Sequence, residues 1–176
     1  MPPPANRNSV FRSWLEEHEG IVTKVTASFA GPHGDAADLR QEALLQLWHS
    51  VPSFDGRCKP STWVYRVCLN TALAWKRKHV RVERTREDGV DVAEISAAAA
   101  GPAESTDQRD LLQELYAAIR TLPEFDRALV LLMLDDLSYR EIAEVTGMTE
   151  TYVGVALTRA RKRLTAAMKG VVDELE

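Results

Sequence analysis

The sequence predicts an all-α protein of two small helical domains joined by a flexible acidic linker. Apolar residues recur at helical spacing on both sides of residues 87–107, and no segment shows the period of two that a half-buried strand requires. The intervening EDGVDVAEISAAAAGPAESTD is acidic and rich in Ala, Ser, Gly and Pro, a composition typical of a linker. The predicted domains therefore span residues 9–86 and 108–170.

The first domain begins with SVFRSWLEEHEGIVTKVTASFA, a helical pattern with an expected bend near Gly20. The following GPHGD predicts a turn, after which Asp35 or Asp38 caps the next helix. That helix, DLRQEALLQLWHSV, turns its apolar residues to one face and its acidic and amide residues to the other. The inward set is Leu39, Ala43, Leu44, Leu47 and Trp48.

A loop rich in turn residues, SFDGRCKPS, follows Pro52 and separates the second helix from the third. We expect Ser61 or Thr62 to begin the third helix, TWVYRVCLNTALAWKRKHVR, in which apolar and basic residues alternate.

The second domain starts with an amphipathic segment, QRDLLQELYAAIRTL, and Pro123 then opens a dense apolar helix. Ser138 and Glu141 have the spacing of a capping box, Gly147 supplies a turn, and Thr149 caps the last helix. The inward stripe of that helix is Val153, Leu157, Ala160 and Leu164.

The net charge of the 176-residue chain is −4, but the charge is unevenly distributed and includes two basic segments. Residues 57–86 hold nine basic residues and one acid, residues 87–114 hold eight acids and one Arg, and residues 157–169 hold five basic residues and no acid. Such separation indicates a bipartite polyanion binder, although solvated helix faces are the simpler alternative.

Several function classes are disfavoured. No apolar run reaches the roughly 20 residues of a membrane span, and MPPPANRNS lacks the apolar core of a signal peptide, so we expect a cytoplasmic protein without membrane insertion. Cys58 and Cys68 are expected to be ordinary reduced thiols rather than a disulfide or metal site. The four His residues are scattered without a nucleophile or paired carboxylates, so no enzyme, metal or cofactor is predicted.

Two motifs indicate nucleic-acid binding. The basic and aromatic residues of the loop and third helix suit single-stranded DNA, where rings stack on bases and cations follow the backbone; the alternative is that Trp63 and Trp75 belong to the core. SYREIAEVTGMTETYVGVALTRARKRL has the layout of a helix-turn-helix, whose second helix enters a major groove. A packed helical hairpin has a similar pattern.

Taken together, DLRQEALLQLW, FDGRCKPSTWVYRVCLNTALAWKRK and LPEFDRALVLLMLDDLSYREIAEVTGMTETYVGVALTRARKRL resemble an extracytoplasmic-function (ECF, group IV) sigma factor of bacterial RNA polymerase. The resemblance implies a sigma region 2-like domain, a sigma region 4-like domain, and a protein that directs promoter-specific initiation. It implies as partners core polymerase, through the β′ clamp helices and β subunit, promoter DNA, and an anti-sigma factor or other protein regulator.

The resemblance also assigns residues by position. Contacts with the clamp helices fall to Asp38, Gln41 and Glu42. Recognition and melting of the −10 element fall to Arg57, Lys59, Trp63, Arg66, Asn70, Lys76, Arg77 and Lys78. Contacts with the −35 element fall to Thr151, Tyr152, Val155, Thr158, Arg159, Arg161 and Lys162.

One departure from the family pattern concerns Gly154, Val155 and Ala156, where members usually carry a Lys or Arg with small polar neighbours. Gly and Ala cannot make the bidentate hydrogen bonds that specify bases. Contacts of Val155 and Ala156 with thymine methyl groups, together with DNA shape, are one expectation. Two alternatives stay open: a helix-turn-helix regulator acting without core polymerase, and a sigma-like protein whose C-terminal domain mainly binds a regulatory protein.

Overall fold

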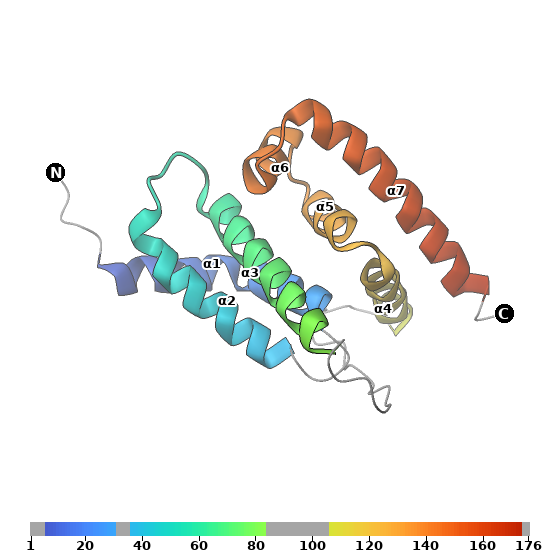
Figure 1. Cartoon of the computed structure of the whole chain (residues 1–176), viewed down its shortest axis with the longest axis horizontal. Helices are drawn as coiled ribbons and strands as arrows, with labels where there is room; N and C mark the ends of the chain where they lie inside the picture. Colours follow the sequence, from blue (N-terminus) through green and yellow to red (C-terminus); the bar gives the residue numbers. More distant parts are fainter. Residues whose placement is uncertain (1–5, 31–35, 84–105, 174–176) are drawn as a thin grey trace. The chain divides into compact units, whose positions relative to one another are not determined.

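The computed structural model describes residues 6–30, 36–83 and 106–173 of the chain, and all its regular elements there are helical. It divides into unit 1, residues 1–96, and unit 2, residues 97–176, which confirms the all-α architecture of two small helical domains (Figure 1). The predicted turn at residues 31–35 and most of the predicted linker lie outside the described residues.

Unit 1 is a bundle of three helices, α1 (Arg7–Phe29), α2 (Ala36–Ser50) and α3 (Pro60–Glu83), each packed against the other two. A short 3₁₀ turn, η1 (Val51–Ser53), follows α2 as expected from Pro52. The buried side chains that hold the bundle together are Trp14, Val22, Val25, Phe29, Leu39, Ala43, Leu47, Val64, Tyr65, Cys68, Leu69 and Ala72. These recur at helical spacing, so burial of one apolar stripe per helix stabilises the bundle.

Two boundaries in unit 1 differ by one or two residues from those expected. The bend in α1 occurs at His18, which has φ −131° and ψ 17°, rather than at Gly20. Helix α3 begins at Pro60 rather than at Ser61 or Thr62. Pro is favoured in the first helical turn because its fixed φ suits a helix and its missing N–H costs nothing there.

Unit 2 consists of α4 (Thr106–Thr121), α5 (Glu124–Leu134), α6 (Tyr139–Thr146) and α7 (Glu150–Asp173). Helix α4 starts two residues before the domain boundary predicted at residue 108. The expected dense apolar helix after Pro123 is α5, in which every residue from Asp126 to Leu132 is buried. Arg127 within that run donates to the carbonyl oxygens of Arg120 and Leu122, so it satisfies acceptors left open at the end of α4.

The helix-turn-helix has the local chemistry expected for it. Ser138 and Glu141 form the predicted capping box, and Gly147 ends α6 in the left-handed region with φ 75°. The Thr149 hydroxyl accepts from the Tyr152 amide at 3.3 Å, which caps α7. Val153, Leu157 and Ala160 are buried and Leu164 is half-buried, which confirms the predicted inward stripe.

Candidate nucleic-acid interface

The outward face of α2 carries an acidic and amide surface. Asp38 and Gln41 are exposed, and the half-buried Glu42 accepts a hydrogen bond from the Gln46 amide at 2.8 Å. Leu45 lies on the same face and is 48% exposed, a residue absent from the predicted site. Spacings of three, four and seven residues from Asp38 place all of them on one side of the helix, and that spacing is the signal that identifies Leu45.

Helix α3 presents the basic and aromatic surface of unit 1. Trp63, Arg66, Asn70 and Arg77 follow one another at spacings of three, four and seven residues, so they share one face. Asn70 and Arg77 are exposed, whereas Trp63 and Arg66 are half-buried. These four side chains form one stripe, which we call the α3 stripe. It combines three kinds of group: an aromatic ring, a hydrogen-bonding amide and two guanidinium groups.

The side chain of Trp63 is held by contacts with the rest of unit 1 and is partly exposed to solvent. Its indole Nε1 donates to the Ser50 hydroxyl at 3.0 Å, and its ring meets Phe54 edge-on with centroids 5.6 Å apart. Phe54 in turn meets Trp14 of the core at 5.2 Å, and the Arg66 guanidinium lies 5.5 Å from the Trp63 ring centroid. The ring is therefore held in a fixed position while part of it faces solvent, so it is a rigid stacking surface as well as a packing residue. Trp75, the other candidate, is half-buried.

The other four cations predicted for the −10 element lie outside the α3 stripe. Lys78 is exposed beside the stripe, and Lys59 is exposed just before α3. Arg57 is exposed in the preceding loop, where its Nε lies 3.1 Å from a carboxylate oxygen of Asp55. Lys76 is half-buried and lies on the inward half of the helix. It is thirteen residues from Trp63, which at 3.6 residues per turn places it about 140° around the helix axis from that ring. The structure separates Lys76 from the other −10 candidates.

The outward face of α7 carries the residues predicted for the −35 element. Thr151, Val155, Thr158 and Lys162 lie along its centre, and Tyr152 and Arg161 lie at its flanks; all six are exposed. The Thr158 hydroxyl donates to the Gly154 carbonyl at 2.9 Å. Ala156 is 2% exposed, so the expectation that it contacts a thymine methyl group is wrong. It belongs to the packed side of α7 together with Val153 and Leu157.

Gly154 has a packing partner. A Cβ atom added at this position would lie 3.4 Å from Cε2 of Tyr139, the first residue of α6. The Tyr139 ring thus lies over the backbone of α7 where a side chain would otherwise project. The nearest side-chain atoms at this position thus belong to a half-exposed aromatic ring of the neighbouring helix.

A buried carboxylate holds two arginines of α7. Asp126 on α5 has a side chain only 1% exposed, and its oxygens pair with Arg159, at 3.3 Å, and with Arg163. Both guanidinium groups stay about half exposed. Arg159, predicted as a DNA contact, is therefore also a structural link between α5 and α7. Arg161 donates from Nε to the Met133 sulfur at 2.9 Å, which leaves Lys162 as the cation nearest the centre of the outward face.

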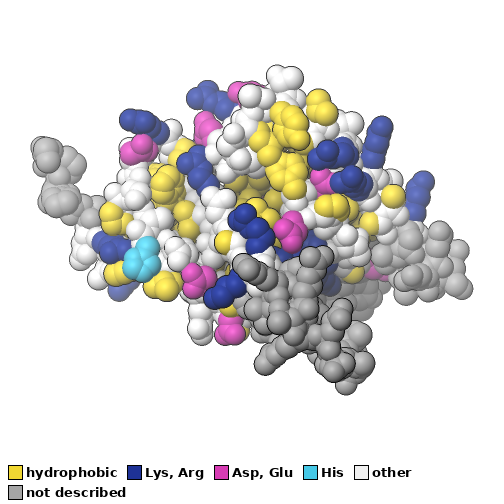
Figure 2. Space-filling view, viewed as in Figure 1, with side chains coloured by type: hydrophobic (Ala, Val, Ile, Leu, Met, Phe, Trp, Pro, Cys, Tyr) yellow, Lys and Arg dark blue, Asp and Glu magenta, His cyan; other side chains and the backbone are white. Residues whose placement is uncertain are grey.

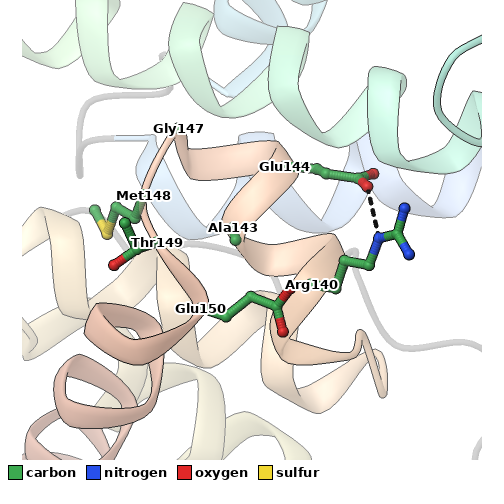
Figure 3. Close-up of a pocket in the computed structure, with 7 residues that line it drawn as sticks. All are labelled: Arg140, Ala143, Glu144, Gly147, Met148, Thr149 and Glu150. Carbon is green, nitrogen blue, oxygen red and sulfur yellow. Dashed lines mark hydrogen bonds and ion pairs between the residues drawn. The ribbon is translucent and has the colours of Figure 1, made fainter.

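A shallow hollow of about 520 Å³ lies at the α6–α7 turn. Figure 3 shows its lining, in which the Arg140 Nε and a Glu144 carboxylate oxygen are 3.3 Å apart. The hollow is wide open and its charged side chains are of both signs, so it has neither the enclosure nor the apolar lining of a small-molecule site.

Neither cysteine belongs to a metal-ligand cluster within the described residues, where no group of three or more His, Cys, Asp or Glu can hold a metal ion. Cys68 is buried in unit 1, and burial raises the pKa of its thiol to about 12. Cys58 is half-buried. No helix among the described residues is long and apolar enough to cross a membrane.

The structure is thus a two-domain, all-helical protein that carries a basic surface on each unit. Unit 1 has a basic and aromatic stripe on α3, and unit 2 has an exposed helix-turn-helix. Family models place the class more narrowly: Sigma-70 region 2 matches residues 10–82, and Sigma-70, region 4 matches residues 112–164.

Individual relatives agree with the family models. The ECF RNA polymerase sigma-E factor of Escherichia coli strain K12 is 31% identical over 144 residues, covering 76% of this chain and 73% of that protein. RNA polymerase sigma factor NccH of Alcaligenes xylosoxydans xylosoxydans is 24% identical over 161 residues, covering 90% of this chain and 87% of that protein.

Two solved structures have the same fold. The sigma factor RpoE in complex with the anti-sigma factor NepR, from Bartonella quintana, has a TM-score of 0.72 and 25% identity and covers 90% of this chain and 96% of its own. CnrH in complex with the cytosolic domain of CnrY has a TM-score of 0.63 at 21% identity, covering 94% and 91%. The chain belongs to the ECF sigma factor family of RNA polymerase. Its class is thus transcription initiation factors.

Proposed function

We propose that this protein binds core RNA polymerase through α2, recognises and opens the −10 element through α3, and contacts the −35 element through α7. The α3 stripe is the observation that carries the proposal. A half-exposed, anchored Trp63 stands beside Arg66, Asn70 and Arg77 on one face. Stacking, hydrogen bonding and phosphate pairing are the three contacts that an unpaired DNA strand requires.

The outward face of α2 has a separate role in the proposal. A DNA-binding face is expected to be cationic, whereas the exposed residues here are Asp38, Gln41 and Leu45, with Glu42 beside them. Such a mixed acidic, amide and apolar face suits a basic protein surface. This favours a polymerase-dependent sigma factor over a helix-turn-helix regulator acting alone, because a regulator of that kind needs no such face.

The test is transcription with purified core polymerase. The full chain plus core should initiate from a promoter mapped for this protein, while the chain alone binds the same duplex poorly. Reversing charge in Asp38→Lys with Glu42→Lys should lower affinity for core by about tenfold or more, because like charges then oppose a basic surface. Glu16→Lys, at an exposed acid of α1, is the matched control and should bind normally. Failure of the unaltered protein to bind core polymerase would overturn the proposal.

A second candidate function is capture by a regulatory protein. Unit 2 exposes Leu134, Tyr139, Tyr152 and Val155 by 40% to 66%, more apolar surface than α2 offers. The Bartonella quintana structure holds its sigma factor with an anti-sigma factor, and we propose that an anti-sigma factor or similar regulator binds this chain as well. Pull-down of a partner by the full chain, lost in Tyr152→Ala but kept in Glu16→Lys, would support it.

A further inference from the structure

The outward face of α7 has an apolar residue, Val155, between Thr151 and Thr158, at a point where a recognition helix usually carries a polar group. Val155 is 66% exposed, the highest value among the large apolar residues exposed in the described structure. Tyr152, three residues earlier on the helix, is 51% exposed. The ring of Tyr139 lies against Gly154 and is 44% exposed. Tyr152 and Val155 are neighbours because they are three residues apart on a helix, and Tyr139 reaches α7 at Gly154, the residue before Val155. We call these three exposed side chains the Val155 patch.

The Val155 patch offers little hydrogen bonding at its centre. Val155 has neither a donor nor an acceptor on its side chain. The hydroxyl proton of Thr158, the next exposed residue along the face, is directed to the carbonyl of Gly154 at 2.9 Å. A ligand pressed on this centre therefore meets carbon atoms and gains free energy by burying carbon atoms of its own.

The charges around the Val155 patch indicate a polyanion rather than an apolar protein face. Arg161 and Lys162 are exposed one to two turns further along α7, about 9–11 Å from Val155 along the helix axis. Residues 157–169 hold five basic residues and no acid. On the face drawn in Figure 2, basic and apolar side chains lie beside one another over α5 to α7. An apolar centre with cations on the following turns suits a duplex groove, in which base edges lie between phosphate strands.

Only one base presents an apolar group in the major groove. Thymine shows its C5-methyl group beside the O4 acceptor, whereas guanine, adenine and cytosine have donors and acceptors but no methyl group on their major-groove edges. We propose that Val155, with Tyr139 and Tyr152 around it, recognises the C5-methyl group of a thymine in the −35 element. The proposal rests on the proposed function, because it requires unit 2 to lie on promoter DNA. It also uses the contact of Tyr139 with α7 at Gly154, which places that ring beside the recognition helix.

Deoxyuridine tests this directly, because it pairs as thymine does and lacks only the methyl group. The full chain with core polymerase is given promoter fragments in which each −35 thymine, on either strand, is replaced by deoxyuridine one at a time. One position should lower initiation by about fourfold, the effect of one buried methyl group. With Val155→Ala that position should no longer matter. Val155→Thr keeps one methyl group at the same place and should retain part of the discrimination. The exposure of Val155 means that neither variant disturbs the core, and thermal melting checks this.

Each outcome decides between the two claims. Normal initiation that is insensitive to deoxyuridine at every −35 position overturns the methyl contact and leaves the proposed function standing. Discrimination that persists unchanged in Val155→Ala overturns the assignment to Val155. No initiation with the unaltered promoter overturns the proposed function and, with it, this inference. Loss of binding to a regulatory protein in Val155→Ala, without any effect of deoxyuridine, would assign the Val155 patch to a protein partner instead.

Discussion

Helices α3 and α7 are both 24 residues long and both carry basic residues, yet their outward faces differ in chemistry. The face of α3 combines an anchored ring, an amide and two guanidinium groups. The face of α7 has Thr151, Val155 and Thr158 at its centre, with Lys162 beyond them.

This difference indicates how the two units divide the recognition of a promoter. Polar groups that hydrogen-bond to bases give strong discrimination, about 1–3 kcal/mol for each good pair, and these stand on α3. A methyl contact is weaker, and phosphate contacts carry no sequence information. We therefore expect unit 1 to contribute most of the specificity and unit 2 most of the attachment to duplex DNA.

The largest effect is expected from the carboxylate that fastens α7 to α5. Asp126→Asn removes a buried charge that pairs with Arg159 and Arg163, so the free energy of unfolding of unit 2 should fall by about 2 kcal/mol, less than for a fully buried pair because both arginines are half exposed. Denaturant unfolding measures it. Asp136→Asn is the control: Asp136 is exposed with φ 55°, a conformation that Asn tolerates, and should change stability by less than about 0.5 kcal/mol. Equal losses in the two variants would contradict the role of Asp126.

The next effect should fall on strand opening in unit 1. Trp63→Ala removes the ring from the α3 stripe and should reduce opening of the −10 element by about tenfold or more, the typical value of one base-stacking contact. Ser50→Ala removes the same 3.0 Å hydrogen bond but keeps the ring, and should open nearly normally. Permanganate reactivity of −10 thymines in the complex with core polymerase measures opening. Similar losses in both variants would mean that Trp63 acts through packing.

A pH effect is expected in unit 1, where Cys68 is buried. Burial raises the pKa of Cys68 from 9.0 to about 12, so above pH 9 the unfolded chain releases a proton that the folded one retains. Unit 1 should therefore lose stability between pH 9 and 12, by about 1.4 kcal/mol for each pH unit. Denaturant unfolding at pH 8 and pH 10 measures the loss. Cys68→Ala should abolish this pH dependence; a loss that is unchanged in the variant would assign it to another group.

A smaller effect should separate the two kinds of cation on α7. Lys162→Ala removes an exposed charge from the outward face and should lower the salt dependence of promoter binding by about one phosphate contact without changing the melting temperature. Arg159→Ala should also lower the melting temperature, because it breaks the pair with Asp126. Promoter titrations of the polymerase complex at several salt concentrations, with melting curves for each variant, measure the two effects. The same salt dependence and the same melting temperature in both variants would contradict the separate roles of Lys162 and Arg159.

The smallest effect concerns Gly154. Gly154→Ala should raise the stability of unit 2 by up to about 1 kcal/mol, because Ala is the better helix former and the added Cβ would meet Tyr139 at 3.4 Å, an ordinary contact. Thermal melting measures it. A lowered melting temperature would show that the ring of Tyr139 packs more tightly on α7 than this distance indicates.

Local chemistry in the sequence predicted much of the fold. Apolar spacing located the helices, and the capping box at Ser138, the turn at Gly147 and the cap at Thr149 need only residues close in the chain. The pairs across helices were missed. Asp126 and Arg159 are 33 residues apart, and no local pattern indicates that α5 and α7 bring them together.

The candidate site shows the same limit. Exposure of the α7 face followed from helical spacing, but Ala156 lies at the edge of the buried stripe, where only packing decides whether a side chain is covered. The neighbour of Gly154 also comes from another helix, since the ring of Tyr139 packs against it. Spacing adds to the predicted set, because Leu45 is seven residues from Asp38 and Lys76 is thirteen from Trp63, which puts Leu45 on the outward face of α2 and Lys76 away from the α3 stripe.

The division of recognition between α3 and α7 is tested most directly by one measurement: initiation by the full chain and core polymerase from a promoter library randomised at both the −10 and the −35 element. We expect sequencing of the transcripts to show the stronger base preference at the −10 element, and at the −35 element a weaker preference that includes a thymine. A −35 preference as strong as that at the −10 element and centred on guanine would contradict the account, because Val155 has no group to recognise that base and Lys162 is assigned to a phosphate contact.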